Sequence, residues 1–391
     1  MGRTRRIAAF GFRSIPPRPG CSGADKFAEE LYARLAERGY EVTAYNRVYA
    51  GGGPARGDYR GIRVFNLRTF RSKGLEALWH SARATAHILR HDTGEVVHVQ
   101  NGGNSIFFPV LRLFGKRVYL TEDGAEWDRG KWPWYARLYL RAMNHLTAHV
   151  PNGVVFDNVF VRETFEQRFH RGYHYIPYGS EPQRNEADTD VLARLGLTSL
   201  GYFLFVGRFI PEKGLQYLIP AFEQVETDRR LVVVGGAQQG SEYARRVTQI
   251  ADPRILFPGF MYGADVHTLM RHAYAYVQPS DLEGLSPAVL ENMALGTPVI
   301  CSDIRENRFV VGDTAITFRK SDVGDLAAKL RLALADRAQL DRNAAAAARR
   351  AAELFSWESV TSQYETVFFG TPLAGAAAGP GGASTTGRGE N

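Results

Sequence analysis

The chain alternates short apolar segments with amphipathic helical segments, and this alternation begins twice. The first series has apolar runs at residues 6–10, 41–45, 96–100 and 118–121. The second series has runs at residues 203–207, 231–235, 255–258, 274–278 and 299–302. Such alternation is typical of a parallel sheet covered by helices. At 391 residues the chain is also longer than one typical domain of about 100–200 residues. The sequence therefore predicts an α/β protein with two Rossmann-like domains.

Composition is that of a globular protein without disulfides. The chain has two cysteines, too few for a disulfide framework or a cysteine-based zinc site. Its net charge of +7 favours phosphate-bearing ligands or an anionic membrane face, or simply reflects an arginine-rich composition. The aromatic and basic residues match no RNA- or DNA-binding module, so nucleic acid is not an expected partner.

The apolar run at residues 7–12 is too short for a signal peptide, and a Pro-Arg segment follows it closely. No apolar run approaches the roughly 20 residues that span a bilayer. We therefore expect a cytoplasmic protein.

The stretch FVGRFIPEKG, residues 205–214, reads as a strand, a loop and the approach to a helix. Ligands of open α/β sheets bind at the carboxyl ends of strands. Arg208 and Lys213 would lie there, and they could hold a diphosphate through a bidentate fork and a point charge. Spacing alone leaves equally open that both side chains are solvated loop cations.

The stretch SDLEGLSPAVLENMALGTPV, residues 280–299, contains a helix with clear ends. Ser286 suits the N-cap, Pro287 the first turn and Gly296 the C-terminus. The free N–H groups at the start of this helix suit a phosphate. Glu291 could accept hydrogen bonds from a vicinal diol such as ribose, although spacing alone favours a water-facing glutamate.

Together these stretches resemble the retaining nucleotide-sugar glycosyltransferases of family four, which have the GT-B fold. Glu283 and Glu291 match the E-x7-E motif of that family, and FVGRFIPEKG precedes them as expected. The first domain resembles a rhamnosyltransferase-like subgroup through G-x-R-x-I-P at residues 11–16 and D-G-x-E-W at residues 123–127.

The resemblance covers the chain up to about residue 369 and implies its organisation. Two Rossmann-like domains would face a central cleft. The N-terminal acceptor domain would span residues 1–178, and the nucleotide-sugar-binding domain residues 179–352. A C-terminal helix at 353–369 would return to the first domain, and residues 370–391 would form a disordered tail.

The resemblance also implies roles for individual residues. Arg208, Lys213 and Glu283 would serve catalysis, together with Asp123 of the first domain. The donor would be held by Ser22, Gly23, Gly207, Arg208, Lys213, Phe260, Glu283, Gly284, Leu285, Ser286 and Glu291. Candidates on the acceptor side are Asn101, Asn104, Glu122 and Trp127. The resemblance implies no cofactor and no metal.

One segment departs from the family pattern. Many relatives carry a histidine before an aspartate near the transferred sugar, whereas this chain has Thr121 at that register, in the sequence TEDG. Asp123 or Glu122 could provide the polar contact instead. Alternatively the sugar pocket has changed, or the enzyme is impaired.

The implied activity is transfer of a hexose or deoxyhexose from a nucleoside-diphosphate sugar, with UDP or dTDP favoured, to a hydroxyl acceptor. Cell-surface polysaccharide assembly on a lipid-linked glycan would bring the protein to the inner face of the plasma membrane as a peripheral partner. Two alternatives are transfer to a soluble small molecule and a degenerate, non-catalytic sugar-nucleotide- or glycan-binding protein. The oligomeric state is not predicted.

Overall fold

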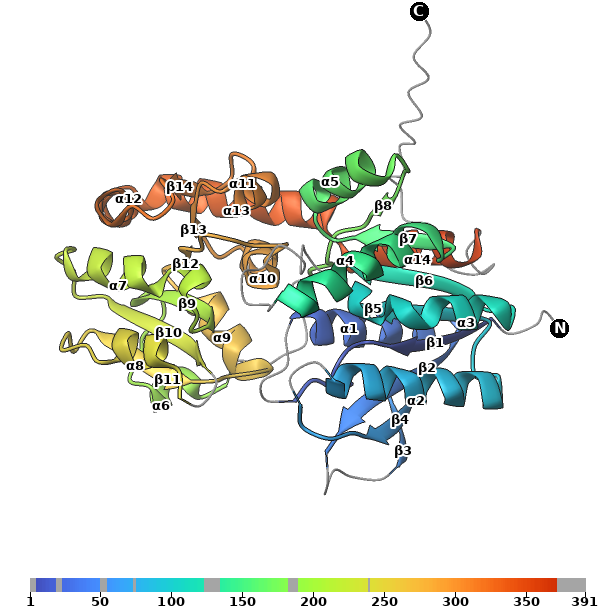
Figure 1. Ribbon diagram of the computed structural model, residues 1–391. Helices are drawn as coiled ribbons and strands as arrows, with labels where there is room; N and C mark the ends of the chain where they lie inside the picture. The colour runs from blue at the N-terminus through green and yellow to red at the C-terminus, as the bar shows by residue number, and fades with distance from the viewer. Residues whose placement is uncertain are drawn as a thin grey trace, which may run out of the picture.

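The structure is a computed structural model of the 391-residue chain, and it places two α/β halves side by side (Figure 1). It describes residues 5–18, 23–49, 55–72, 75–122, 134–181, 189–237 and 240–370, with the side chains of 134–137 excluded. The predicted site residues Ser22, Asp123 and Trp127 lie outside the described residues, as does the predicted tail from residue 371 onward.

The first sheet has eight strands within the described ranges, in the order β3-β4-β2-β1-β5-β6-β7-β8. All neighbouring strands are parallel except β3 and β4, which form an antiparallel hairpin. The strands are β1 (Arg6–Phe10), β2 (Glu41–Val48), β3 (Arg56–Tyr59), β4 (Ile62–Arg68), β5 (Val96–Gln100), β6 (Arg117–Glu122), β7 (Gly153–Phe156) and β8 (His174–Tyr175). The associated helices are α1 (Gly23–Glu37), α2 (Leu75–His91), η1 (Gly102–Phe107), α3 (Phe108–Leu113), α4 (Trp134–His149) and α5 (Val159–Phe169).

The second sheet has six described strands, all parallel, in the order β11-β10-β9-β12-β13-β14. They are β9 (Tyr202–Arg208), β10 (Arg230–Gly236), β11 (Ile255–Gly259), β12 (Ala275–Gln278), β13 (Val299–Ser302) and β14 (Ile316–Phe318). The remaining helices are α6 (Val191–Arg194), η3 (Pro211–Lys213), α7 (Leu215–Glu223), α8 (Glu242–Thr248), α9 (Ala264–His272), α10 (Pro287–Leu295), α11 (Arg305–Val311), α12 (Val323–Ala335), α13 (Arg337–Leu354) and α14 (Trp357–Phe369).

The predicted fold class is confirmed, because both halves are Rossmann-like α/β units. Every strand named from the sequence is present, with ends within a few residues of those expected. Parallel strands buried on both faces explain this success, since β1, β5, β12 and β13 are nearly continuous apolar runs with almost no exposed residue. The exact domain boundaries at residues 178 and 352 stay predictions.

Helix α14 returns from the second half of the chain to the first sheet, as predicted, and lies beside β6 (Figure 1). Its aromatic rings complete the core of the first domain: Tyr364 packs on Phe27, and Phe368 packs on Tyr119. Arg38, which directly follows α1, forms ion pairs with two glutamates of this helix, the fully buried Glu365 and the half-exposed Glu358. A buried ion pair therefore fixes the last helix to the first domain.

No helix in the described part of the chain combines the length and the apolar character that a bilayer span requires.

We predict that replacing Glu365 with Gln lowers the free energy of unfolding by about 3 kcal/mol, because it removes the buried counter-charge of Arg38 and leaves only the half-exposed Glu358 to pair with the guanidinium. Glu358→Gln removes an ion pair to the same arginine from an exposed position, and should cost at most about 1 kcal/mol. Thermal unfolding of the two variants measures the difference. Equal melting temperatures would contradict the assigned role of Glu365.

Candidate functional site

The carboxyl ends of strands from both sheets face one large cleft with a volume of about 2310 Å³. Residues of α1, β2 and β5 line one wall, and residues of β9, α9 and α10 line the other. The described residues predicted to bind the donor all line this cleft: Gly23, Gly207, Arg208, Lys213, Phe260, Glu283, Gly284, Leu285, Ser286 and Glu291. Residues from distant parts of the sequence therefore meet at one site, where open α/β sheets commonly bind ligands.

Helix α10 begins and ends where the sequence predicts. Ser286 is its N-cap, and the serine hydroxyl accepts a hydrogen bond from the backbone N–H of Val289 at 3.4 Å. Pro287 occupies the first turn, and Gly296 closes the helix with a φ of 73°. The start of α10 lines the cleft, so its N–H groups and the positive end of its dipole are available to an anion.

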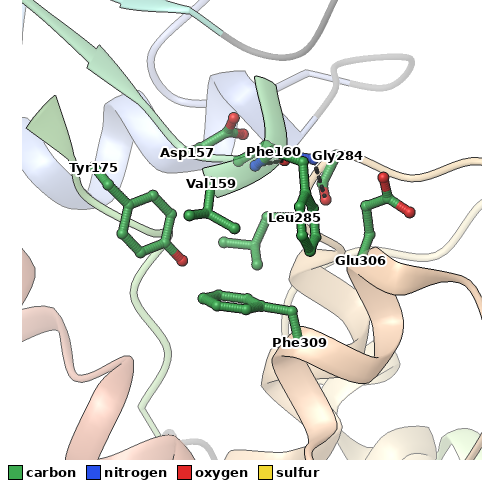
Figure 2. A pocket seen from close by; sticks show the side chains of 9 residues that line it. Asp157, Val159, Phe160, Tyr175, Gly284, Leu285, Glu306 and Phe309 are labelled. Carbon is green, nitrogen blue, oxygen red and sulfur yellow. Dashed lines mark hydrogen bonds between the residues drawn. The ribbon is translucent and has the colours of Figure 1, made fainter. Parts of the chain in front are cut away.

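The loop before α10 is held by the first domain. Asn158, the N-cap of α5, donates a hydrogen bond from Nδ2 to the carbonyl oxygen of Gly284 at 3.1 Å. Figure 2 shows Gly284 and Leu285 beside Phe160 and Phe309 around a small cavity. Its volume of about 10 Å³ is near the minimum for one water molecule. This region is therefore a contact between the domains and not a ligand site.

Lys213 and Glu283 form an ion pair at the centre of the second-domain wall. The Lys213 ammonium lies 2.7 and 2.8 Å from the two carboxylate oxygens. Gln278 donates a further hydrogen bond to Glu283, and its amide also donates to Ser280 at 2.7 Å. Because the Glu283 side chain is only 6% exposed, these donors fix the direction of its carboxylate.

Gly214 allows the loop that carries Lys213 to come close to Glu283. It has a φ of +78°, and a Cβ at this position would lie 1.9 Å from the carbonyl oxygen of Pro279. Only glycine therefore lets the Lys213 loop pack against the end of β12, from which Glu283 follows after a short loop.

Arg208 ends β9 and is exposed to the cleft. No described residue hydrogen bonds to its guanidinium or forms an ion pair with it. Gly207 and Gly235, on adjacent strands, let the backbones of β9 and β10 converge here, since a Cβ on Gly235 would lie 1.8 Å from the oxygen of Gly207. Arg208 is thus an exposed cation of the cleft without a described partner, whereas Lys213 is paired.

Glu291 is bound by a residue that the sequence reasoning missed. Lys26 of α1 reaches across from the first domain and donates to Glu291 at 2.5 Å, while its ammonium lies 3.4 Å from Nε2 of His267. Burial acts to lower the pKa of Lys26, but the Glu291 carboxylate outweighs this effect and raises it, so the amine stays charged. The one signal in the sequence was the position of Lys26 in the first turn of a helix that follows a glycine-rich loop.

Gly23 allows α1 to approach α10 closely enough for that contact. A Cβ on Gly23 would lie 2.9 Å from Cγ of Pro287, so a larger residue would push the two helices apart. Lys26 and Glu291 each lie about one turn further along their helices. The first turns of two helices from different domains therefore meet at the predicted donor site.

Thr121, at the register where relatives carry a histidine, belongs to a buried hydrogen-bond network. Its hydroxyl lies 2.8 Å from Nε2 of His98 and 2.8 Å from the hydroxyl of Tyr364. Nδ1 of His98 lies 2.9 Å from the hydroxyl of Tyr32. Burial lowers the pKa of His98 to about 3, so the imidazole is neutral. Thr121 thus connects β5, β6 and α14, in addition to lining the cleft.

The acceptor-side candidates are largely engaged in local structure. Asn101 caps η1 by accepting from Gly103 at 2.9 Å, and Asn104 donates to the oxygen of Gln100 at 3.0 Å. Both asparagines line the cleft. Glu122 is 3% exposed and accepts a hydrogen bond from the backbone of Gly102 at 2.6 Å, and it is not part of the cleft lining.

Phe260 follows β11 and is 49% exposed in the cleft. Its ring is stacked with that of Tyr262 at an interplanar angle of 9°. Gly236 makes room for it, since a Cβ there would lie 2.6 Å from the Phe260 ring. An exposed aromatic pair of this kind can support a planar ligand group such as a nucleobase.

Two family matches cover most of the chain. Residues 22–179 match the family described as glycosyl transferase 4-like domain, and residues 197–351 match glycosyl transferases group 1. The second match contains Arg208, Lys213, Glu283 and Glu291.

Curated relatives match part of the chain. O-antigen chain mannosyltransferase B of Escherichia coli is 30% identical over 181 residues, which is 44% of this chain and 47% of that protein. A glycogen synthase of Mycobacterium tuberculosis is 30% identical over 182 residues, which is 45% of this chain and 44% of that protein. The matched part thus spans somewhat less than half the length of these relatives.

Solved structures share the whole fold. Sucrose-phosphate synthase from Thermosynechococcus elongatus has a TM-score of 0.79 at 22% identity, over 93% of this chain and 98% of that one. HepE from Anabaena, solved with UDP-glucose, has a TM-score of 0.74 at 17% identity, over 93% and 99% of the two chains.

We predict that Lys26→Met increases the radius of gyration measured by small-angle X-ray scattering without nucleotide, because it removes an ion pair that joins the domains. Arg60→Met is the matched control, since Arg60 lines the same cleft but pairs with Glu30 of its own domain. A Lys26→Met protein as compact as the wild type would refute a role for this ion pair in closure.

Proposed function

The chain belongs to the group 1 glycosyl transferases, and on this premise we propose that it transfers a hexose or deoxyhexose from a nucleoside-diphosphate sugar to a hydroxyl, with retention of configuration. The observation that carries the proposal is the Lys213–Glu283 ion pair beside the start of α10, with Arg208 and Glu291 in the same cleft. These groups match the chemistry of a sugar diphosphate.

Each part of the donor has a complementary surface. The N–H groups at the start of α10, Arg208 and Lys213 would bind the diphosphate. Glu291 would accept hydrogen bonds from the ribose hydroxyls, and Glu283 from hydroxyls of the sugar. The Phe260 ring would lie against the base. UDP and dTDP sugars are the favoured donors, and HepE, which shares the fold, was solved with UDP-glucose.

Catalysis would rest on orientation and on stabilisation of the leaving group. The bond between the sugar C1 and the diphosphate oxygen breaks, and its electron pair leaves with the diphosphate. The acceptor oxygen bonds to C1 from the same face, and its proton passes to the departing diphosphate. Arg208, Lys213 and the helix N–H groups stabilise the charge that develops on the diphosphate. This scheme uses no covalent nucleophile on the protein.

The biological setting we propose is assembly of a cell-surface polysaccharide. The match to an O-antigen mannosyltransferase supports this setting. The motif at residues 11–16, which resembles a rhamnosyltransferase-like subgroup, is the reason that a deoxyhexose such as rhamnose is included among the proposed sugars. A soluble small-molecule acceptor is the second candidate. A degenerate binding protein is the third, motivated by Thr121, whose hydroxyl is already bonded to His98 and Tyr364.

The surface of the first domain supports a peripheral membrane contact. Exposed large apolar side chains gather on α2, η1, α3 and α4 and on the segments beside them, and η1 contacts all three helices. They are Phe70, Leu75, Trp79, Ile106, Val110, Leu113, Phe114 and Leu138. Arg112 and Arg141 are exposed on the same helices. Apolar side chains beside cations suit the interface of an anionic membrane.

We predict that UDP or dTDP raises the melting temperature of the wild-type protein more than GDP does, because a ligand that binds only the folded state stabilises it. Glu291→Gln should weaken nucleotide affinity about 10- to 100-fold, since it removes a charged acceptor from the ribose. Lys213→Ala should lower the rate of transfer or donor hydrolysis about 100- to 1000-fold.

Glu212→Gln is the control for these variants, because Glu212 adjoins Lys213 but is exposed and outside the cleft lining. Wild-type nucleotide affinity in Glu291→Gln would rule out the ribose assignment. Nucleotide binding without any transfer or hydrolysis would favour the degenerate binding protein.

We predict that Leu113→Ser combined with Phe114→Ser lowers binding to phosphatidylglycerol vesicles at least about tenfold, because these side chains, 83% and 63% exposed, no longer enter the interface. Leu332→Ser removes a half-exposed leucine from α12 of the second domain and should leave binding unchanged. Vesicle co-sedimentation measures both. Equal binding by the double variant and the wild type would exclude this surface.

A further inference from the structure

Arg47 is a cation on the first-domain wall of the cleft, opposite the predicted donor residues of the second domain. Arg47 lies near the carboxyl end of β2, Gly11 directly follows β1, and Gln100 ends β5. These strands are neighbours in the order β2-β1-β5, and all three residues line the cleft. The chain leaves β1 toward β2 on one side and continues from β5 toward β6 on the other, so this is the switch point of the sheet.

The Arg47 guanidinium is held in place without an ion pair. Its Nη2 donates to the carbonyl oxygen of Gly11 at 3.0 Å. Its Nε is buried and has no hydrogen-bond partner among the described residues. No carboxylate in the described part of the chain lies within ion-pair distance of it. The hydrogen bond to Gly11 therefore orients a cation whose charge no described residue neutralises by direct contact.

The nearby carboxylates are occupied by other donors. Glu76 accepts from the hydroxyl of Tyr49 at 3.1 Å and from the backbone of Ser72 at 3.3 Å. Asp25 is 1% exposed and accepts from the backbone N–H of Arg13 at 2.6 Å. These two carboxylates influence Arg47 only through space, and they accept no hydrogen bond from its guanidinium.

The electrostatic surroundings make this arrangement costly. Burial lowers the pKa of Arg47, the field of Glu76 partly opposes this effect, and the neighbouring cation Arg13 adds to it. The adjacent His80 is fully buried, and burial with the Arg47 charge lowers its pKa to about 3, so the imidazole is neutral and does not offset the Arg47 charge. A partly desolvated cation without a counter-charge destabilises a fold and is typical of a binding site.

We propose that Arg47 binds an oxyanion, a phosphate or a carboxylate, carried by the acceptor, so that the acceptor of this enzyme is an anionic hydroxyl compound. The inference rests on the proposed function for the identity of the ligand as acceptor. The second-domain wall supplies the cations for the donor diphosphate, Arg208 and Lys213, so Arg47 on the opposite wall serves a different anionic group. The guanidinium fork suits bidentate contact with such a group.

The test is thermal unfolding of the protein saturated with UDP, so that the diphosphate site is filled. Inorganic phosphate and acetate at millimolar concentration are compared with chloride at equal ionic strength. We expect phosphate, acetate or both to raise the wild-type melting temperature by about 2 °C or more. The anion that gives the larger shift identifies the group as phosphate or carboxylate.

Arg47→Met should lose this shift, and Arg47→Lys should retain only part of it, because lysine keeps the charge without the fork. Arg90→Met on the exposed end of α2, outside the cleft lining, should keep the whole shift. Without added phosphate or acetate, Arg47→Met should melt at or above the wild-type temperature, since it removes an unneutralised charge. If Arg47 served only to stabilise the fold, Arg47→Met would instead melt below the wild-type temperature.

An absent shift in the wild type, or equal shifts in wild type and Arg47→Met, overturns the proposal. The proposed function fails separately: it fails if UDP does not stabilise the protein and no donor is hydrolysed or transferred, whatever phosphate does. If phosphate or acetate still stabilised such a protein through Arg47, the oxyanion site would stand, but its ligand would not be the acceptor of a glycosyl transfer.

Discussion

The cleft depends on the attachment of α14 to the first domain. The buried Glu365 pairs with Arg38, directly after α1, and Tyr364 and Phe368 fill the core between α1 and the first sheet. Since α13 packs on α10 of the second domain and leads directly into α14, this attachment also sets where the second sheet can lie. The carboxyl ends of the two sheets consequently face each other, and the residues at those ends share one cleft.

Three cations of the cleft illustrate how the fold distributes charge. Lys213 is neutralised within its own domain by Glu283, and Lys26 is neutralised across the domain interface by Glu291. Arg47 has no such partner among the described residues. Paired charges tolerate burial, whereas an unpaired cation is stabilised by a ligand that brings an anion. The pairing state thus separates Lys213 and Lys26, whose charges the protein itself balances, from Arg47, whose charge no described residue balances by direct contact.

Much of the fold and the second-domain site was predictable because its determinants are local. Strands buried on both faces are continuous apolar runs, and the ends of α10 follow from Ser286, Pro287 and Gly296. The first domain was less predictable. Lys26 carries no motif, and its role arises only where Gly23 lets α1 approach Pro287. Thr121 marked a departure from the family pattern, but its bonds to His98 and Tyr364 join three distant segments.

By itself, the sequence determined two parallel α/β units, the caps of α10 and the residue types of a sugar-nucleotide site, because periodicity, capping and motif spacing act over short distances along the chain. The tertiary structure alone decided which charges meet. Lys26 and Glu291 are 265 positions apart, and Lys213 and Glu283 are 70 apart. Whether a charged side chain is paired or available depends on distances and burial across such separations, and no local pattern records them.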